Sequence, residues 1–242
     1  ELKVSDRMTS KNLITVPMGT SLEQAKRKLQ EHRIEKLLVV EKKKLKGLIT
    51  VKDILKKEHF PQATIDKYGR LVAAAAVGIS PDTLKRVKAL VDVNIDVIFI
   101  DTAHAHSKSV IDKLKSIKKK FPNLQVIVGN VATKEGFEDL CKAGADAVKI
   151  GIGAGSICTT RIIAGVGVPQ LAAVLDCKKI SKKYKIPLIS DGGMRYSGDI
   201  AKSIAAGSDT VMLGGLFAGS DESPGEIILW EGRTFKKYRG MG

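Results

Sequence analysis

Six short apolar stretches recur between residues 71 and 213, and segments of helical periodicity separate most of them. The stretches are rich in valine, isoleucine and alanine, as expected for strands that are buried on both faces. Strands that alternate with helices predict a parallel sheet. We expect strands at residues 71–77, 96–101, 125–128, 147–150, 187–190 and 210–213, and helices at 81–90, 107–119 and 134–143. Ser80 and Pro81 suit the N-cap and the first position of the helix at 81–90.

Each of these predicted strands ends in a polar or glycine-rich turn. Such turns at every carboxyl end favour a (β/α)8 (TIM) barrel, with an open doubly wound sheet as the alternative. A closed barrel needs eight βα units, and six are visible here. We therefore predict an α/β fold of the barrel type, of which two units are absent from the chain as given.

The first 58 residues show a different order of elements. We expect strands at 13–16, 37–40 and 48–50 and helices at 21–32 and 51–57, with Ser21 as the first N-cap. The order β-α-β-β-α resembles that of a CBS (cystathionine β-synthase) module. The sequence thus predicts two domains, a CBS-like module at 1–58 and a barrel domain at 70–242.

Composition narrows the class of protein. The chain has 242 residues, of which 43% are hydrophobic, and this is enough for a packed core. No apolar run approaches the roughly 20 residues of a membrane-spanning helix, and the first residues are too polar for a signal peptide. Three cysteines argue against a disulfide framework and for a reducing cytoplasm. We expect a cytoplasmic protein without a membrane partner.

The net charge of +15 comes from 41 Lys and Arg residues against 26 Asp and Glu residues. Lysines cluster at 42–44, at 118–120 and near 182–185. A surface that binds phosphates or nucleic acid is one interpretation. Solvated helix faces and loops are the better one, because no zinc-ligand spacing or RNA-binding aromatic motif accompanies the charge. We therefore do not expect nucleic acid as a partner.

The strongest chemical signal lies at residues 151–161, where a predicted strand runs into a glycine-rich turn that carries Cys158. Glycines allow the backbone to fold tightly and to direct its carbonyl and amide groups at a ligand. A thiol beside exposed amides can act as a thiolate nucleophile. A buried structural cysteine is the other interpretation, and we prefer it for Cys141 and Cys177 because both lie within helical patterns.

Glycine pairs follow the last two predicted strands. Gly192 and Gly193 come directly after Asp191, and Gly214 and Gly215 follow the next strand. Loops in these positions of a barrel commonly bind phosphate through backbone N–H groups, and a carboxylate beside them can accept hydrogen bonds from ribose hydroxyls. Ordinary tight turns are the alternative, but two pairs at successive strand ends favour a nucleotide site.

A third candidate cluster contains Asp101, His104 and His106. Two histidines that are two residues apart could bind a metal, but no third ligand is placed to join them. Asp101 is the better functional candidate, because it stands at the carboxyl end of a predicted strand.

The motif from Ser156 through Cys158 and Thr160 to Gln170 resembles the catalytic-loop signature of the IMP dehydrogenases, where IMP is inosine 5′-monophosphate. The resemblance covers nearly the whole chain, and the long cysteine loop is its most specific part. The further matching segments are 191–193, 223–226 and 238–242, together with 33–38 and 47–53, which resemble the family's second CBS repeat.

The resemblance implies oxidation of IMP to xanthosine monophosphate with reduction of NAD, in guanine nucleotide synthesis. Cys158 would attack C2 of the hypoxanthine ring, a hydride would pass to NAD, and water would hydrolyse the resulting thioimidate. Thr160 would lie near that water. The family also implies a homotetramer.

The resemblance further assigns binding roles. The residues that would bind IMP are Ser156, Asp191, Gly192, Gly193, Gly214, Gly215, Tyr238, Gly240, Met241 and Gly242. Those that would face NAD are Asp101, Gly151, Ile152 and Gly153. Backbone carbonyls of Gly153, Gly155 and Cys158 would coordinate a potassium ion (K+).

The chain departs from the family pattern at three positions. Ala154 replaces the usual proline of the cysteine loop, Ala105 a glycine, and Gly215 a serine. The family's mobile flap would follow Gly242, and the first barrel strands and first CBS repeat would precede Glu1. We therefore expect a partial chain that does not turn over by itself.

Two other functions are compatible with the resemblance. GMP (guanosine monophosphate) reductase, which uses NADPH, shares the barrel and the cysteine loop, and residues 212–215 lean toward it. The CBS-like module and the segments 223–226 and 238–242 favour the dehydrogenase. A nucleotide-sensing CBS module is the alternative from another class, since Thr50 and Asp53 resemble its ribose-binding Thr-x-x-Asp. An adenine or guanine nucleotide is the expected ligand there.

Overall fold

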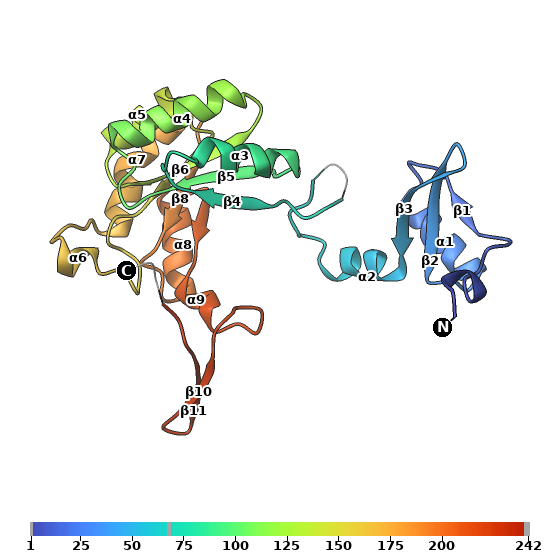
Figure 1. Ribbon diagram of the computed structural model, residues 1–242. Coiled ribbons are helices and arrows are strands. Elements are labelled where there is room, and N and C mark those ends of the chain that lie inside the picture. The colour runs from blue at the N-terminus through green and yellow to red at the C-terminus, as the bar shows by residue number, and fades with distance from the viewer. Residues whose placement is uncertain (1, 67–68, 240–242) are drawn as a thin grey trace. The chain divides into compact units, whose positions relative to one another are not determined.

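The computed structural model of the chain describes residues 2–66 and 69–239. These residues belong to two compact units, 1–71 and 72–242 (Figure 1). The first unit extends beyond the boundary expected at 58, to Leu71, which forms an isolated antiparallel bridge with Ile65.

The first unit is a small sheet with two main helices. Its elements are η1 (Val4–Asp6), β1 (Thr15–Val16), α1 (Leu22–Glu31), β2 (Lys36–Glu41), β3 (Lys44–Thr50) and α2 (Val51–His59). β1 pairs with β2 in parallel, and β2 pairs with β3 antiparallel. Ser21 accepts a hydrogen bond from the Gln24 N–H at 3.2 Å, so the predicted N-cap of α1 is present. The order β-α-β-β-α is the predicted one, while its assignment as a CBS module remains a prediction.

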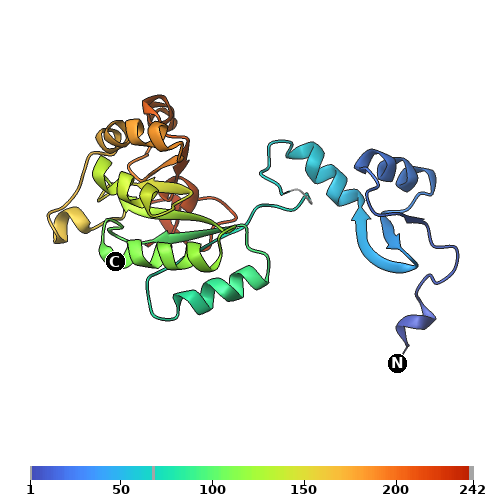
Figure 2. The same cartoon turned by 90° about the horizontal axis from the view of Figure 1, so that it is seen from above.

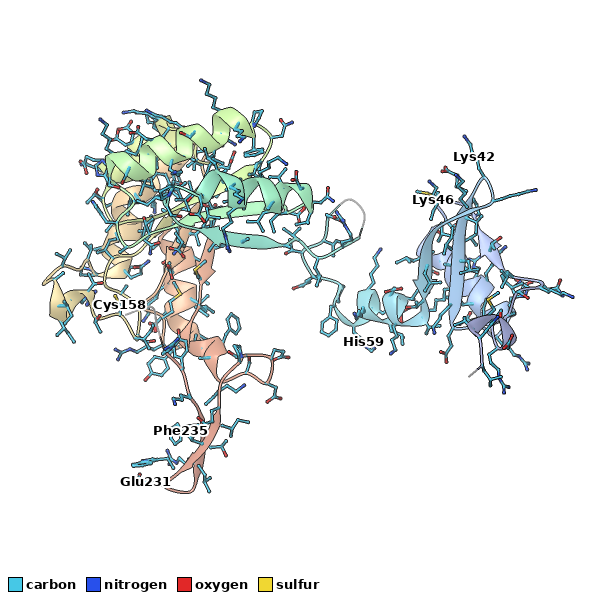
Figure 3. The ribbon with its side chains drawn as sticks, in the orientation of Figure 1. Lys42, Lys46, His59, Cys158, Glu231 and Phe235 are labelled. Carbon is cyan, nitrogen blue, oxygen red and sulfur yellow. The ribbon has the colours of Figure 1, made fainter. Side chains whose placement is uncertain are left out.

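The first lysine run lies in the turn between β2 and β3. Lys42 and Lys43 have φ angles of 47° and 63°, as the central residues of a two-residue hairpin turn require. Both side chains are exposed, and Figure 3 labels Lys42 in this turn and Lys46 in the following strand. These lysines are therefore part of a solvated turn.

The second unit is built on six parallel strands. They are β4 (Ala74–Val77), β5 (Val97–Asp101), β6 (Gln125–Val131), β7 (Ala147–Ile150), β8 (Leu188–Asp191) and β9 (Thr210–Met212), and they pair in chain order. The sheet is curled, with the helices on its outer face (Figures 1 and 2). A doubly wound sheet requires a reversal of strand order, and the described strands show none. The order therefore supports the barrel type over the open alternative.

Helices connect the strands and cover the sheet. They are α3 (Thr83–Asp92), α4 (Lys108–Lys120), α5 (Lys134–Lys142), α7 (Gln170–Tyr184) and α8 (Ser197–Ala206). Phe137 of α5 and Leu114 of α4 are fully buried against strand residues such as Ile98 and Val148. No helix of the described residues is long and apolar enough to cross a membrane.

Several predicted bounds were wrong by a few residues. The helix expected from Pro81 begins at Thr83, with Asp82 as its N-cap. Ser80 hydroxyl donates to the Asp82 carboxylate at 2.6 Å, and Thr83 hydroxyl donates to the Gly78 carbonyl at 2.9 Å. These side-chain bonds stabilise a loop conformation through Pro81, which delays the helix.

Residues 215–236 form elements that the apolar pattern did not predict. Two are the short helix α9 (Gly215–Ala218) and the antiparallel hairpin of β10 (Ile227–Trp230) and β11 (Arg233–Lys236). Figure 3 labels Glu231 and Phe235 on this hairpin. Outside this range, the short helix α6 (Thr160–Ile163), which follows Cys158, was also not predicted.

Replacing Phe137 by alanine tests the core of the second unit. Phe137 has 0% of its surface exposed, so Phe137→Ala should lower the free energy of unfolding by about 3–5 kcal/mol. Phe217→Ala is the matched control, because Phe217 is 62% exposed and should cost far less. Urea unfolding followed by circular dichroism measures both, and equal losses would contradict the packing described here.

Candidate active site

Loops at the carboxyl ends of β7, β8 and β9 surround a cavity of about 180 Å³. Seven of the residues expected to bind IMP line it: Ser156, Asp191, Gly192, Gly193, Gly214, Gly215 and Tyr238. Sequence reasoning did not foresee that Met194, Arg195 and Met212 also line it. The remaining three predicted residues, Gly240, Met241 and Gly242, lie outside the described residues.

The turn after β9 is in close contact with two other loops. A Cβ at Gly214 would lie 2.6 Å from the Tyr238 hydroxyl oxygen, so a side chain there would displace the tyrosine. A Cβ at Gly215 would lie 3.2 Å from Ser156 Oγ. The absence of a side chain at Gly215 therefore avoids a tight contact with the cysteine loop.

Cys158 is on the loop that joins β7 to α6, and Figure 3 labels it. Its Sγ lies 3.2 Å from Thr160 Oγ1, and its backbone N–H donates to the Gly155 carbonyl at 3.1 Å. Hydrogen bonds from the Thr160 hydroxyl and backbone N–H, together with the nearby Arg161 charge, lower the pKa of the Cys158 thiol. Cys158 itself is not in the cavity wall, but Ser156 and Ile157 of the same loop are.

The other two cysteines have the opposite electrostatics. Burial, with a contribution from Glu138, raises the pKa of the Cys141 thiol to about 11. Burial, with a contribution from Asp176, raises the pKa of the Cys177 thiol to about 12. Because the thiolate is the reactive form, the lowered pKa favours reaction at Cys158 and the raised pKa values disfavour it at Cys141 and Cys177.

A buried ion network, which the sequence analysis missed, lies beside the cavity. Lys149 of β7 is 2% exposed, and its Nζ lies 2.5 Å from Asp191 Oδ2 and 3.1 Å from Asp101 Oδ1. Asn130 Nδ2 also donates to Asp191 Oδ2, at 3.0 Å. The available signal was a charged residue inside the apolar strand 147–150, since buried charges are rare unless paired.

The residues expected to face NAD divide into two kinds. The Asp101 side chain, 40% exposed at the end of β5, remains open to a ligand. Gly151 has a φ of +146°, its N–H donates to Val131, and its carbonyl accepts from Asn130. Ile152 accepts from Val168. The backbone groups of Gly151 and Ile152 that make these hydrogen bonds therefore hold the loop in place.

The two histidines do not form a metal centre in the described part of the chain, where no group of three His, Cys, Asp or Glu side chains could hold an ion. His106 Nε2 lies 3.0 Å from Asp139 Oδ2 of α5, and its ring is 6.3 Å from that of His104. His106 thus joins a loop to a helix.

The parallel sheet, with a glycine-rich cavity at its carboxyl edge and a thiol of lowered pKa on an adjoining loop, defines the class: an α/β protein with a candidate active site at the strand ends. Residues 18–242 match the model of the IMP dehydrogenase / GMP reductase domain. The chain belongs to the IMP dehydrogenase / GMP reductase family.

Named relatives agree with this assignment. The chain is 57% identical over 240 residues to the inosine-5′-monophosphate dehydrogenase of Halalkalibacterium halodurans, covering 99% of this chain and 50% of that protein. It is 55% identical over 240 residues to that of Aquifex aeolicus, covering 99% and 49%. The chain thus spans about half the length of the curated relatives it matches.

A solved structure shows the same fold. It is a GMP reductase variant from Trypanosoma brucei in complex with guanosine 5′-monophosphate, with a TM-score of 0.89 and 41% identity. The match covers 98% of this chain and 49% of that one.

The three thiols should differ in their rate of alkylation by iodoacetamide. The lowered pKa of Cys158 means that its alkylation reaches half-maximal rate at a lower pH than that of an ordinary cysteine. Thr160→Val removes the hydroxyl donor, so the Cys158 pKa rises and the inflection moves to higher pH. Peptide mass spectrometry measures the rate at each cysteine.

Thr159→Val is the matched control for this experiment. Thr159 is the neighbouring threonine, and its side chain makes no capping hydrogen bond to α6. Its replacement should leave the pH profile of Cys158 unchanged. Equal profiles for all three cysteines, or no shift in Thr160→Val, would show that the contact does not activate the thiol.

Proposed function

We propose that the protein oxidises IMP to xanthosine monophosphate and reduces NAD, through a covalent intermediate on Cys158. The observation that carries this proposal is the activated Cys158 thiol on a loop whose neighbouring residues line a glycine-rich cavity. The names of the relatives, which are 55–58% identical to this chain, support the same reaction.

Cys158 supplies the nucleophile. Its sulfur forms a bond to C2 of the hypoxanthine ring, and the C2 hydrogen leaves with its electron pair. NAD, when bound, supplies the acceptor for that hydride. Water then adds to C2, the C–S bond breaks, and xanthosine monophosphate leaves with the oxygen from water. Splitting a hard step into two is the gain of covalent catalysis.

Thr160 has two roles in this proposal. Its hydroxyl and backbone N–H stabilise the Cys158 thiolate before attack and again when the thiol leaves. Because its Oγ1 lies 3.2 Å from Cys158 Sγ, the Thr160 hydroxyl would also lie near the carbon bonded to that sulfur, where the hydrolytic water would bind. The cost of losing one such hydrogen bond to a charged group is about 1.5–3 kcal/mol.

IMP would bind in the cavity between the three loops. Backbone amides of the Gly192–Gly193 and Gly214–Gly215 turns would hold the phosphate, and Asp191 would accept hydrogen bonds from the ribose hydroxyls. Ser156 and Tyr238 would complete the wall, and Gly240, Met241 and Gly242 would extend it.

NAD and potassium would bind on the other side of the cysteine loop. The exposed part of Asp101 fits a hydrogen-bond acceptor for NAD, and Gly151, Ile152 and Gly153 would form the floor of that site. Carbonyls of Gly153, Gly155 and Cys158 are the oxygen ligands that a hard cation prefers. The Gly155 carbonyl already accepts from Cys158 N–H, so it would offer its second lone pair.

We also propose how the barrel closes, what the first unit binds and how the protein assembles. The edges of the curled sheet, β4 and β9, would each pair with a further strand to close the (β/α)8 barrel. The first unit would act as a CBS module that binds an adenine or guanine nucleotide. The cytoplasmic protein would assemble as a homotetramer. These features rest on the resemblance to the IMP dehydrogenases.

GMP reductase is the second candidate. The solved GMP reductase structure, at 41% identity, favours it through the shared fold. The curated IMP dehydrogenases are closer in sequence, at 55–58%. A reductase would consume NADPH in the presence of GMP and release ammonia.

The two activities are separated by absorbance at 340 nm. The whole protein should form NADH from IMP and NAD and should not consume NADPH with GMP. Cys158→Ser should abolish NADH formation, because serine lacks the acidic thiol, whereas the control Cys141→Ser should retain it. NADPH consumption with GMP would contradict the dehydrogenase.

Potassium dependence tests the proposed carbonyl site. Replacing K+ by Na+ at constant ionic strength should lower the rate of NADH formation, since the smaller ion fits the same carbonyls less well. Iodoacetamide labelling of Cys158 in both salts gives a readout besides activity, because a cation bound to its carbonyl would change the loop. Identical rates and labelling in both salts would contradict the site.

A further inference from the structure

A lysine side chain spans three neighbouring strand ends beside the cavity. Asp101, Gly129 and Lys149 occupy equivalent register positions on β5, β6 and β7. A Cβ at Gly129 would lie 2.6 Å from the Lys149 Cβ. The absence of a side chain at Gly129 therefore gives Lys149 the room to reach Asp101 across the intervening strand.

The Lys149 ammonium group also contacts a carboxylate at the end of β8. Its Nζ lies 2.5 Å from Asp191 Oδ2 and 3.1 Å from Asp101 Oδ1, and its side chain is only 3% exposed. A buried ammonium is costly unless carboxylates pair with it. We call Lys149, Asp101 and Asp191 together the Lys149 bridge.

Both hydrogen-bond donors that contact the Asp191 carboxylate bind the same oxygen, Oδ2. Lys149 Nζ and Asn130 Nδ2 both donate to Oδ2, the latter at 3.0 Å. Within residues 2–66 and 69–239, no hydrogen bond reaches Asp191 Oδ1. The carboxylate is thus held by one oxygen while the other is left to accept, in a residue that lines the cavity.

The geometry points to Lys149 as a positioning residue that orients Asp191 to accept hydrogen bonds from the ribose hydroxyls of a bound nucleotide. This inference rests on the proposed function and deepens it, because it assigns the ribose recognition to a pair of residues. Lys149 itself acts through Asp191 and is not required to touch the substrate. Lys149 also pairs with Asp101, so it joins Asp191, the proposed acceptor for the ribose of IMP, to Asp101, the proposed acceptor for NAD.

The test compares IMP with 2′,3′-dideoxyinosine monophosphate, which lacks both ribose hydroxyls. Binding of each to the whole protein is measured by isothermal titration calorimetry, and the ratio of the two affinities gives the discrimination. Lys149→Met should lower this ratio by about tenfold or more, because Asp191 loses its fixed orientation. Lys149→Arg keeps the charge and should restore part of the ratio.

Lys118→Met is the matched control. Lys118 Nζ lies 2.8 Å from Asp146 Oδ2 and donates to the Leu124 carbonyl at 3.0 Å. This pair stands beside the starts of β6 and β7, away from the carboxyl ends. Its loss should lower stability but leave the discrimination ratio unchanged. A merely structural role of Lys149 would give the same pattern as this control and would overturn the inference.

A second variant covers the case in which Lys149→Met does not fold. The double variant Lys149→Met/Asp101→Asn removes one carboxylate along with the ammonium, so less uncompensated charge is buried. Against Asp101→Asn alone, it should show the same fall in discrimination, and an unchanged ratio would contradict the role of Lys149.

Different outcomes would contradict the proposed function and the positioning role of Lys149. A wild-type protein that binds neither nucleotide would contradict the function and this inference together, whereas one that binds IMP but forms no NADH would contradict the function alone. A wild type that forms NADH and discriminates normally, with a Lys149→Met variant that does the same, would contradict the positioning role alone.

Discussion

The ends of β7 and β8 lie so close together that position 151 has no room for a side chain. Gly151 has a φ of +146°, and a Cβ there would collide with the Asp191 carbonyl oxygen. Gly151 begins the loop that carries Cys158, and Asp191 precedes the glycine pair at 192 and 193. Their contact therefore determines where the Cys158 loop leaves the sheet relative to the nucleotide cavity.

Side-chain hydrogen bonds hold this junction in place. Asn130 donates to both the Gly151 carbonyl and the Asp191 carboxylate. Gln170 donates to the Ile150 carbonyl and to Ser190 Oγ, and both of these bonds are 2.8 Å long. These bonds join β6, β7, β8 and the start of α7. A sheet end tied in this way is a rigid base from which catalytic loops can be positioned accurately.

The sequence predicted the sheet because its strands are short apolar runs that end in glycine or polar residues. β7 was predicted with its observed bounds, and all four of its residues are buried, Lys149 included. The β10–β11 hairpin was not predicted, although Ile227–Trp230 is an apolar run; all four of its residues are exposed, so this strand lies outside the buried sheet on which the prediction was built. The helix at Thr83 begins late because local side-chain bonds compete with it, which periodicity does not register.

The candidate site was predictable where glycine pairs follow strands, since backbone approach requires them. The Lys149 bridge was not predicted, because its partners are on three separate strands and become neighbours only through the register. The lowered pKa of Cys158 likewise depends on a contact with Thr160, and a thiol in the same sequence could have pointed elsewhere. The sequence thus provided candidate groups, Cys158 and the glycine pairs, and the fold added the contacts that lower the Cys158 pKa and join Asp191 to Lys149.

Our proposal makes Cys158 the covalent nucleophile. The most direct measurement is the mass of each cysteine peptide after the whole protein is incubated with IMP and NAD and quenched in acid. We expect a nucleotide adduct on the peptide that contains Cys158. An adduct on Cys141 or Cys177, or no adduct while NADH accumulates, would contradict it.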